Sequence, residues 1–207
     1  MGIMAPMDTS PLLGADDPRL APSSRVGDAW AAIAAVSDLE LAPVRERMRR
    51  LLATRPHPLD RRERPGHLTG SALVVDAAAE RILVLLHTKL GIWVQPGGHA
   101  DGDACLAGVA LCEAGEETGI TGLRVHPRAV DLDIHEVHPP GEDPHLHHDV
   151  RFLVVAPPGA EPNPNHESRE ARWIVPDELD ALGADTGLHR LARRGLALAC
   201  RLRDGGP

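Results

Sequence analysis

The sequence predicts a globular α/β protein, and three observations support this fold class. The chain of 207 residues is long enough for one domain with an extension and a packed core. Hydrophobic residues make up 43% of it and charged residues 25%, as in ordinary soluble proteins. In the second two thirds of the chain, short strand-like apolar runs are mixed with helix-like segments. Because there are three Trp, one Phe and no Tyr, the core must be built from Ala, Val, Leu and Ile.

The first part of the chain predicts a mobile segment followed by a small helical extension. Residues 1–25 are rich in Pro, Asp and Ser and show no periodicity, so we expect them to be mobile or loosely docked. Residues 26–66 contain two helix-like stretches and end in a charged linker at 57–66. We expect the two helices to pack on the main domain, with a substrate lid or a homodimer contact as the functional alternative.

The main domain is expected over residues 67–207. Apolar runs bounded by turn residues predict strands over 71–76, 81–87, 93–95, 123–125, 130–137, 149–156 and 171–175. Helices are predicted over 104–118, from 176 onward and over 187–202. Asp101 or Asp103 is expected to cap the first of these helices, and Gly119 to end it. Loops rich in Pro, Gly and His are expected over 139–148 and 157–167.

Charge and cysteine content limit the partners and the compartment. The net charge of −8 with no basic patch argues against a nucleic-acid polymer. The cysteines, Cys105, Cys112 and Cys200, form no CxxC pair and are expected to be free thiols in a reducing cytoplasm. The N-terminus lacks the pattern of a signal peptide, and no apolar run is long enough to cross a membrane. We therefore expect a cytoplasmic protein without a membrane partner.

Three carboxylates dominate the end of the helix predicted over 104–118. Glu113, Glu116 and Glu117 are spaced i, i+3 and i+4, which places them within an arc of roughly 100° on a helix. Like charges at this spacing repel one another, and a bound divalent cation removes the repulsion. Oxygen ligands on one rigid face suit Mg²⁺ or Mn²⁺, above all when substrate phosphates complete the coordination.

The stretch from Gly98 to Ile120 resembles the Nudix box. The family pattern is Gly, five residues, Glu, seven residues, then Arg-Glu-hydrophobic-any-Glu-Glu-any-Gly-hydrophobic. Laid from Gly98, the pattern agrees with the chain in register at Glu113, Ala114, Glu116, Glu117, Gly119 and Ile120. The preceding residues 93–99 (WVQPGGH) also resemble the strand and loop that lead into the box.

This resemblance implies a Nudix-type α/β/α sandwich with a mixed sheet and, here, a short helical N-terminal extension. It also implies a Mg²⁺- or Mn²⁺-dependent hydrolase that cleaves the diphosphate linkage of a small, nucleotide-like substrate. By position, the metal ligands would be Glu113, Glu116 and Glu117 with the Gly98 carbonyl. Glu116 or Glu117 would also orient or deprotonate the attacking water. The alternative is a weakened Nudix-fold module that binds a nucleotide or regulates without turnover.

Two departures from the pattern favour the alternative. Ala104 stands where the family has its first Glu, and Cys112 where it has Arg. A thiol cannot form the ion pair by which Arg braces a catalytic Glu, and losses of this kind typically cost about 10- to 100-fold. A reactive thiol is not expected at Cys112, because three neighbouring carboxylates should raise its pKa.

Four residues outside the box helix are candidates for substrate binding. His99 directly follows the glycine loop, where it would contact a phosphate or make a structural hydrogen bond. Glu167 lies in a loop beyond the box, where many Nudix enzymes carry an extra metal-binding or basic Glu. Trp93 would stack a base or anchor the core. Arg151 would bind phosphate or only pair with a carboxylate.

The chain contains twelve histidines, several of them close together in sequence: His135, His138, His145, His147 and His148. If the strand at Asp149 extends backward, His145 and His147 share one face and His148 takes the other. The spacing does not match that of a typical zinc-hydrolase cluster. The alternatives are a surface or phosphate-contacting role, a second metal site, or a zinc hydrolase built on these histidines.

Overall fold

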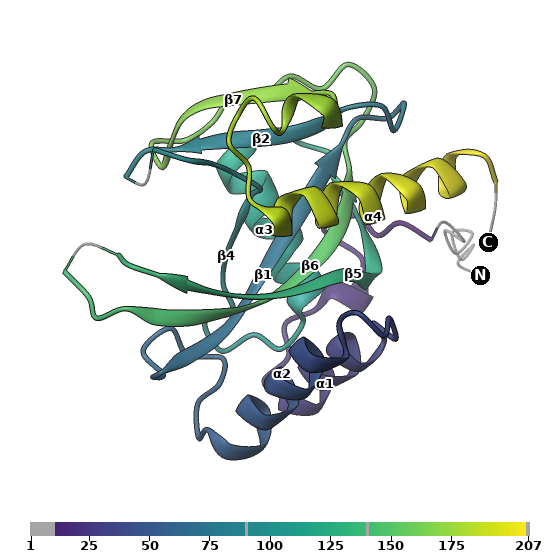
Figure 1. Cartoon of the computed structure of the whole chain (residues 1–207). Coiled ribbons are helices and arrows are strands. Elements are labelled where there is room, and N and C mark those ends of the chain that lie inside the picture. Colours follow the sequence, from purple (N-terminus) through teal and green to yellow (C-terminus); the bar gives the residue numbers. More distant parts are fainter. Residues whose placement is uncertain (1–10, 90, 140, 206–207) are drawn as a thin grey trace, which may run out of the picture.

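The computed structural model describes residues 11–89, 91–139 and 141–205 (Figure 1). Within these residues, seven strands form one sheet in the order β3-β2-β1-β6-β5, with β4 paired to β1 and β7 to β2. β1 and β6 are parallel, and the other pairs are antiparallel, so the sheet is mixed. The strands are β1 (Gly66–Val75), β2 (Ile82–His87), β3 (Trp93–Val94), β4 (Gly97–His99), β5 (Arg124–Val137), β6 (His145–Val155) and β7 (Ser168–Ile174).

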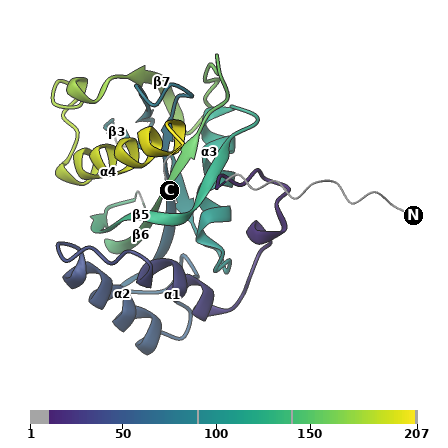
Figure 2. The ribbon, with the colours of Figure 1, turned by 90° about the vertical axis from the view of Figure 1, so that its right-hand side faces the viewer.

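Helices cover both faces of this sheet. Helix α3 (Leu106–Thr118) lies on one side and α4 (Thr186–Arg203) on the other, as Figure 2 shows. Two N-terminal helices, α1 (Val26–Ala34) and α2 (Ala42–Thr54), pack together below the sheet in Figure 1. Short 3₁₀ turns complete the described elements at Pro18–Leu20 (η1) and Pro176–Glu178 (η2). The predicted α/β/α sandwich with a helical N-terminal extension is confirmed.

The central strand β1 is buried along its whole length because both of its faces are packed. A Cβ at Gly70 would lie 3.0 Å from the Leu106 carbonyl oxygen, so α3 approaches this face closely. On the other face, a Cβ at Gly195 of α4 would lie 2.3 Å from Leu73 Cδ2. Side chains alternate between the two faces of a strand, so Ala72 and Val74 join the α3-side core and Leu73 joins the α4-side core. The core is aliphatic, as the composition predicts.

The element boundaries differ from the sequence prediction where tertiary pairing extends a strand. β6 begins at His145, inside the segment expected as a loop, because residues 146–149 pair with residues 66–69 of β1. The two strands expected over 123–125 and 130–137 form one strand, β5, with an irregular register near Ala129. Gly98, expected in the loop that leads into the box, pairs with Gly70 of β1.

The start of α3 also differs from the prediction, whereas its end agrees with it. The N-cap residue is Cys105, which makes no side-chain capping bond. Asp103 instead accepts a hydrogen bond of 2.8 Å from the Cys105 N–H. Gly119 ends the helix in the left-handed conformation, with φ at 66°.

The segment expected to be mobile or loosely docked lies partly outside the described residues, at 1–10. Its described part is docked on the main domain. Leu13 is 1% exposed and exchanges two backbone hydrogen bonds with Val125, of 2.8 and 2.9 Å. Leu20 is buried in the α3-side core. No helix among the described residues is both long and apolar enough to span a membrane.

Candidate active site

The carboxyl-terminal half of α3 holds its glutamates against the β4 backbone. A Cβ at Gly98 would lie 2.4 Å from Glu113 Cδ, so only glycine leaves room for this carboxyl group. Glu117 accepts a hydrogen bond of 2.8 Å from the backbone N–H of Gly97. The glycine strand β4 and the helix α3, which follow one another in the box, therefore form one site.

Burial and mutual repulsion perturb two of these carboxyl groups. Burial raises the pKa of Glu117 to about 7, and the charges of Glu113, Glu167 and Glu116 add to the effect. Burial, followed by the charges of Glu116 and Glu167, raises the pKa of Glu113 to about 7 as well. A divalent cation between these oxygens would restore their ionised form. The donor set thus fits the hard cation that the family uses.

Glu116 is the exposed member of the set, and it is hydrogen-bonded to the residue that replaces the family arginine. Cys112 Sγ lies 3.1 Å from Glu116 Oε1, one helical turn away. This hydrogen bond, burial and the Glu116 charge raise the pKa of the Cys112 thiol to about 11. The thiol therefore stays protonated and donates a neutral hydrogen bond where an arginine would supply a charged one. The predicted increase in the Cys112 pKa is confirmed.

The loop before β7 brings Glu167 close enough to act electrostatically on the box. Asn165 Nδ2 donates a hydrogen bond of 3.1 Å to the Glu116 carbonyl oxygen, and Asn165 Oδ1 accepts one of 2.8 Å from the Glu167 N–H. The Thr88 N–H binds the Glu167 carbonyl at 2.8 Å. The loop expected over 157–167 is thus fixed at the end of α3, and the Glu167 charge raises the pKa of Glu113 and Glu117.

Ala104 lies in a buried position. It is 1% exposed, and its N–H donates a hydrogen bond of 2.6 Å to the Ser23 carbonyl. The docked N-terminal segment therefore covers the place where the family carries its first glutamate.

Arg151 pairs with carboxylates in this structure, which is one of its two expected roles. Its guanidinium group lies 2.7 Å from Asp149, 3.0 Å from Asp133 and 3.5 Å from Asp131. The arginine side chain is 3% exposed. Arg190 of α4 shares Asp131 at 2.8 Å, so this network joins β5, β6 and α4. Its position is that of a structural counter-ion.

Trp93 is half-buried on the edge strand β3 and packs against the α4-side core. The Arg172 guanidinium carbon lies 4.9 Å from the centre of its ring. One ring face therefore already has a cationic partner, in agreement with the core-anchor alternative.

His99 belongs to a group of imidazoles on the sheet face opposite Glu113. Strand alternation turns His99 away from the face on which Gly98 meets Glu113. Its ring centre lies 5.1 Å from that of His67 and 5.2 Å from that of His147. No local pattern singles out His67, because only the parallel register of β1 and β6 places it beside His147.

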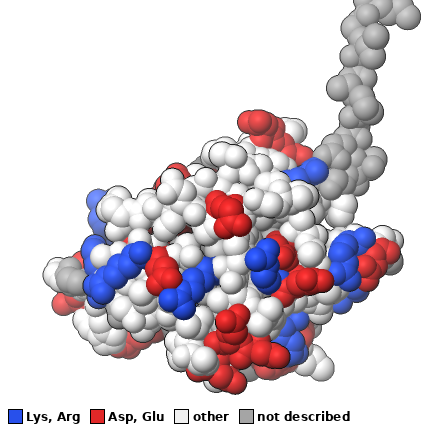
Figure 3. All heavy atoms as spheres, turned by 90° about the horizontal axis from the view of Figure 1, so that it is seen from above, with Lys and Arg blue, Asp and Glu red and all other residues white. Residues whose placement is uncertain are grey.

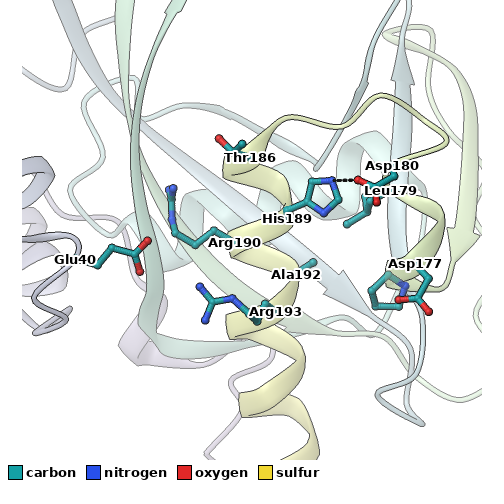
Figure 4. A pocket seen from close by; sticks show the side chains of 10 residues that line it. Glu40, Asp177, Leu179, Asp180, Thr186, His189, Arg190, Ala192 and Arg193 are labelled. Carbon is teal, nitrogen blue, oxygen red and sulfur yellow. Dashed lines mark ion pairs between the residues drawn. The ribbon is translucent and has the colours of Figure 1, made fainter.

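A separate hollow of about 590 Å³ lies between α4, η2 and the chain after α1 (Figure 4). His189 pairs with Asp180 at 3.2 Å on one side, and Arg190, Arg193 and Glu40 line the other. None of its lining residues belongs to the box, so we do not assign the site to it. In Figure 3, basic and acidic side chains are interspersed over the described part of one face, without a continuous basic patch.

Fold and site together define a class: a mixed sheet between two helices, with a carboxylate-rich helix end against a glycine strand. The NUDIX domain family profile matches residues 67–194. The chain therefore belongs to this family and is a Nudix-type hydrolase, which acts on phosphoric anhydride bonds.

Solved structures share the fold. The Ap4A hydrolase of C. elegans in a binary complex is 17% identical, with a TM-score of 0.53 over 64% of this chain and 97% of that one. The dihydroneopterin triphosphate pyrophosphohydrolase of E. coli is 15% identical, with a TM-score of 0.52 over 66% and 97%. A NUDIX hydrolase from Alicyclobacillus acidocaldarius is 17% identical, with a TM-score of 0.50 over 65% and 94%. No curated protein sequence matches the chain.

Proposed function

We propose that this protein is a metal-dependent hydrolase that cleaves the diphosphate linkage of a nucleoside diphosphate derivative. The observation that carries the proposal is the convergence of Glu113 and Glu117 on the backbone of Gly97 and Gly98. The carboxylates repel one another in the metal-free protein, so their close placement is unfavourable there. The same placement becomes favourable once a cation and substrate phosphates are present.

The metal we propose is Mg²⁺ or Mn²⁺, held by Glu113, Glu116, Glu117 and the Gly98 carbonyl. Oxygen donors of this kind suit hard cations. When bound, such a cation neutralises charge on the phosphates and lowers the pKa of bound water.

The protein groups supply positioning and proton transfer. The Gly97 N–H fixes the Glu117 carboxylate, which leaves its other oxygen for a ligand. Glu116 is exposed, so its carboxylate is available to orient the attacking water and accept its proton. Glu167, whose charge acts on both buried glutamates, is a further group for the metal or substrate. His99 lies among other imidazoles, Trp93 lies against Arg172, and Arg151 pairs with carboxylates, so we assign none of the three a direct contact with the substrate.

The substrate class rests on the family and on its structural neighbours. The names of two neighbours include Ap4A and dihydroneopterin triphosphate, both small phosphorylated compounds. A net charge of −8 also disfavours a nucleic-acid polymer as the substrate. The three free cysteines support our proposal that the protein resides in a reducing cytoplasm.

A second candidate is a module that binds a nucleotide without hydrolysing it. The observation in its favour is the pair of departures at Ala104 and Cys112, the first buried beneath the N-terminal segment and the second uncharged.

The test is phosphate or nucleotide release from a panel of nucleoside diphosphate derivatives, with Mg²⁺ and with EDTA. Glu116→Gln and Glu117→Gln are compared with the wild type, and Glu80→Gln, at an exposed turn, is the matched control. We expect the wild type and Glu80→Gln to release phosphate or nucleotide only with the metal present. Glu116→Gln and Glu117→Gln should lose this release. Saturable Mg²⁺-dependent binding of one compound without release would instead establish the binding module.

A further inference from the structure

Three histidines from three adjacent strands meet on the sheet face opposite the box glutamates. His67 lies on β1, His147 is its partner on the parallel strand β6, and His99 lies on β4 beside Thr69. One ligand nitrogen from each imidazole lies within 4.8 Å of the other two. The three rings therefore surround a common point.

This spacing is close to that of a metal-bound imidazole set. With bonds of about 2.1 Å and tetrahedral angles, ligand nitrogens around Zn²⁺ lie roughly 3.4 Å apart. Reaching that separation from 4.8 Å or less requires each nitrogen to move by less than about 1 Å, which side-chain rotation can supply.

Two of these imidazoles carry a buried nitrogen without a hydrogen-bond partner among the described residues. His67 is 0% exposed, and within the described residues its Nε2 and that of His147 have no hydrogen-bond partner. Buried polar atoms are nearly always paired, because leaving one unpaired forfeits its hydrogen bonds to water without replacement. Two such nitrogens side by side are therefore available to a shared ligand.

The other nitrogen of His67 is already oriented for this role. Its Nδ1 lies 3.4 Å from the Glu63 carbonyl oxygen. Because a carbonyl only accepts hydrogen bonds, Nδ1 carries the proton and the Nε2 lone pair points into the cluster. Metal-binding histidines typically donate their second N–H to a carbonyl or carboxylate in this way.

We propose that His67, His99 and His147 bind Zn²⁺, or another borderline divalent transition metal, at a site separate from that of the box. Neutral imidazole favours such ions, whereas Mg²⁺ prefers oxygen. The fourth position would be taken by a water molecule, because among the described residues the set of ligand nitrogens within 4.8 Å of one another contains only these three histidines. His145 lies beside the set, with its ring centre 5.1 Å from that of His67 and 5.4 Å from that of His147.

The histidine site affects the box glutamates, because β4 lies between the histidine cluster and the glutamates. Gly98 touches Glu113 on one face, and the next residue, His99, belongs to the imidazole cluster on the other. An ion bound by the histidines would tie β4 to β1 and β6 and so fix the glycine segment on which the glutamates rest. The role that we assign to the bound ion is therefore to hold β4 in position.

The experiment measures Zn²⁺ directly, without substrate. The full chain is stripped of metal, and Zn²⁺ is titrated in competition with a chromophoric chelator, followed by Co²⁺ substitution and visible absorption. The variants are His99→Phe and His147→Phe, which keep an aromatic ring and remove its nitrogens. His148→Phe is the matched control, because His148 is a buried neighbour on the same strand whose side chain faces the other side.

We expect one Zn²⁺ per chain in the wild type and in His148→Phe. In His99→Phe and His147→Phe the affinity for Zn²⁺ should fall by more than about 100-fold, which exceeds the loss caused by removing a hydrogen bond to a metal ligand. Glu116→Gln and Glu117→Gln should retain the Zn²⁺, which separates this site from the box. Binding that survives in His99→Phe and His147→Phe, or is lost only in the box variants, would overturn the proposal. So would stabilisation by inorganic phosphate with no Zn²⁺ bound, since it would make the cluster an anion site. Circular dichroism of each variant confirms that it is folded.

Discussion

Cys112 Sγ lies 3.1 Å from Glu116 Oε1 on the exposed face of α3. The residue in place of the family arginine therefore still contacts a box glutamate, but through a neutral donor whose pKa is raised to about 11. A thiol is a weak donor and supplies no positive charge. The departure at this position therefore weakens the support of Glu116 without abolishing it.

Cys112→Arg should raise the rate of hydrolysis. A guanidinium group one turn before Glu116 would form a charge-assisted hydrogen bond in place of the neutral one from the thiol. The better-oriented carboxylate should raise kcat by about 10-fold. The measurement is kcat and KM with Mg²⁺ on the substrate found in the panel. Cys112→Ser, which keeps a neutral donor, is the control and should stay near the wild type. An unchanged or lower kcat in Cys112→Arg would show that support of Glu116 does not limit the reaction.

Ala104→Glu should destabilise the fold and should not restore a family ligand. Ala104 is 1% exposed beneath the chain at Ser23, so a carboxylate there would be buried without a partner or would displace the N-terminal segment. We expect a loss of more than about 2 kcal/mol in the free energy of unfolding, measured with urea. Ala78→Glu, at an exposed turn, should change it by less than about 0.5 kcal/mol. Equal stability of the two variants would contradict the burial of position 104.

Local signals in the sequence predict the end of α3 and the presence of its three glutamates on one helix. The spacing of Glu113, Glu116 and Glu117 is a property of one helix, and Gly119 ends it through its own left-handed backbone. Contact between these glutamates and Gly98 follows only when β4 pairs with β1. The sequence could indicate that contact through the family resemblance alone.

Features that depend on strand register could not be predicted. His67 meets His147, and Arg151 meets Asp131, because β6 lies between β1 and β5 in a specific register. Register is set by pairing between distant segments, which a single sequence does not reveal. For the same reason, residues 145–148 looked like a polar loop, although their pairing with β1 makes them a strand.

The Glu117 carboxyl group should lower the stability of the metal-free protein as the pH rises from about 4.5 to above 7. Burial raises the pKa of Glu117 to about 7 from its ordinary value of 4.5, so the folded state binds more protons than the unfolded state in this interval. Glu117→Gln removes the titration and keeps an acceptor for the Gly97 N–H. In EDTA the variant should therefore exceed the wild type in stability at pH 8 by about 2 kcal/mol, and match it near pH 4.5. Thermal unfolding at both pH values measures this difference. A difference that does not change with pH would contradict the burial of this charge.

Arg151→Met should be strongly destabilising, because it leaves the buried carboxylate of Asp149 without its main counter-ion at 2.7 Å. Removing one partner of a buried ion pair typically costs about 3–5 kcal/mol. Arg172→Met is the matched control: Arg172 pairs with Glu170 at 2.5 Å on the exposed edge of the sheet, where such pairs contribute at most about 1 kcal/mol. Urea unfolding of both variants gives the comparison. If Arg151 instead serves mainly to bind phosphate, Arg151→Met would raise KM and would be about as stable as Arg172→Met. That result would show that the ion-pair network does not hold β5, β6 and α4 together.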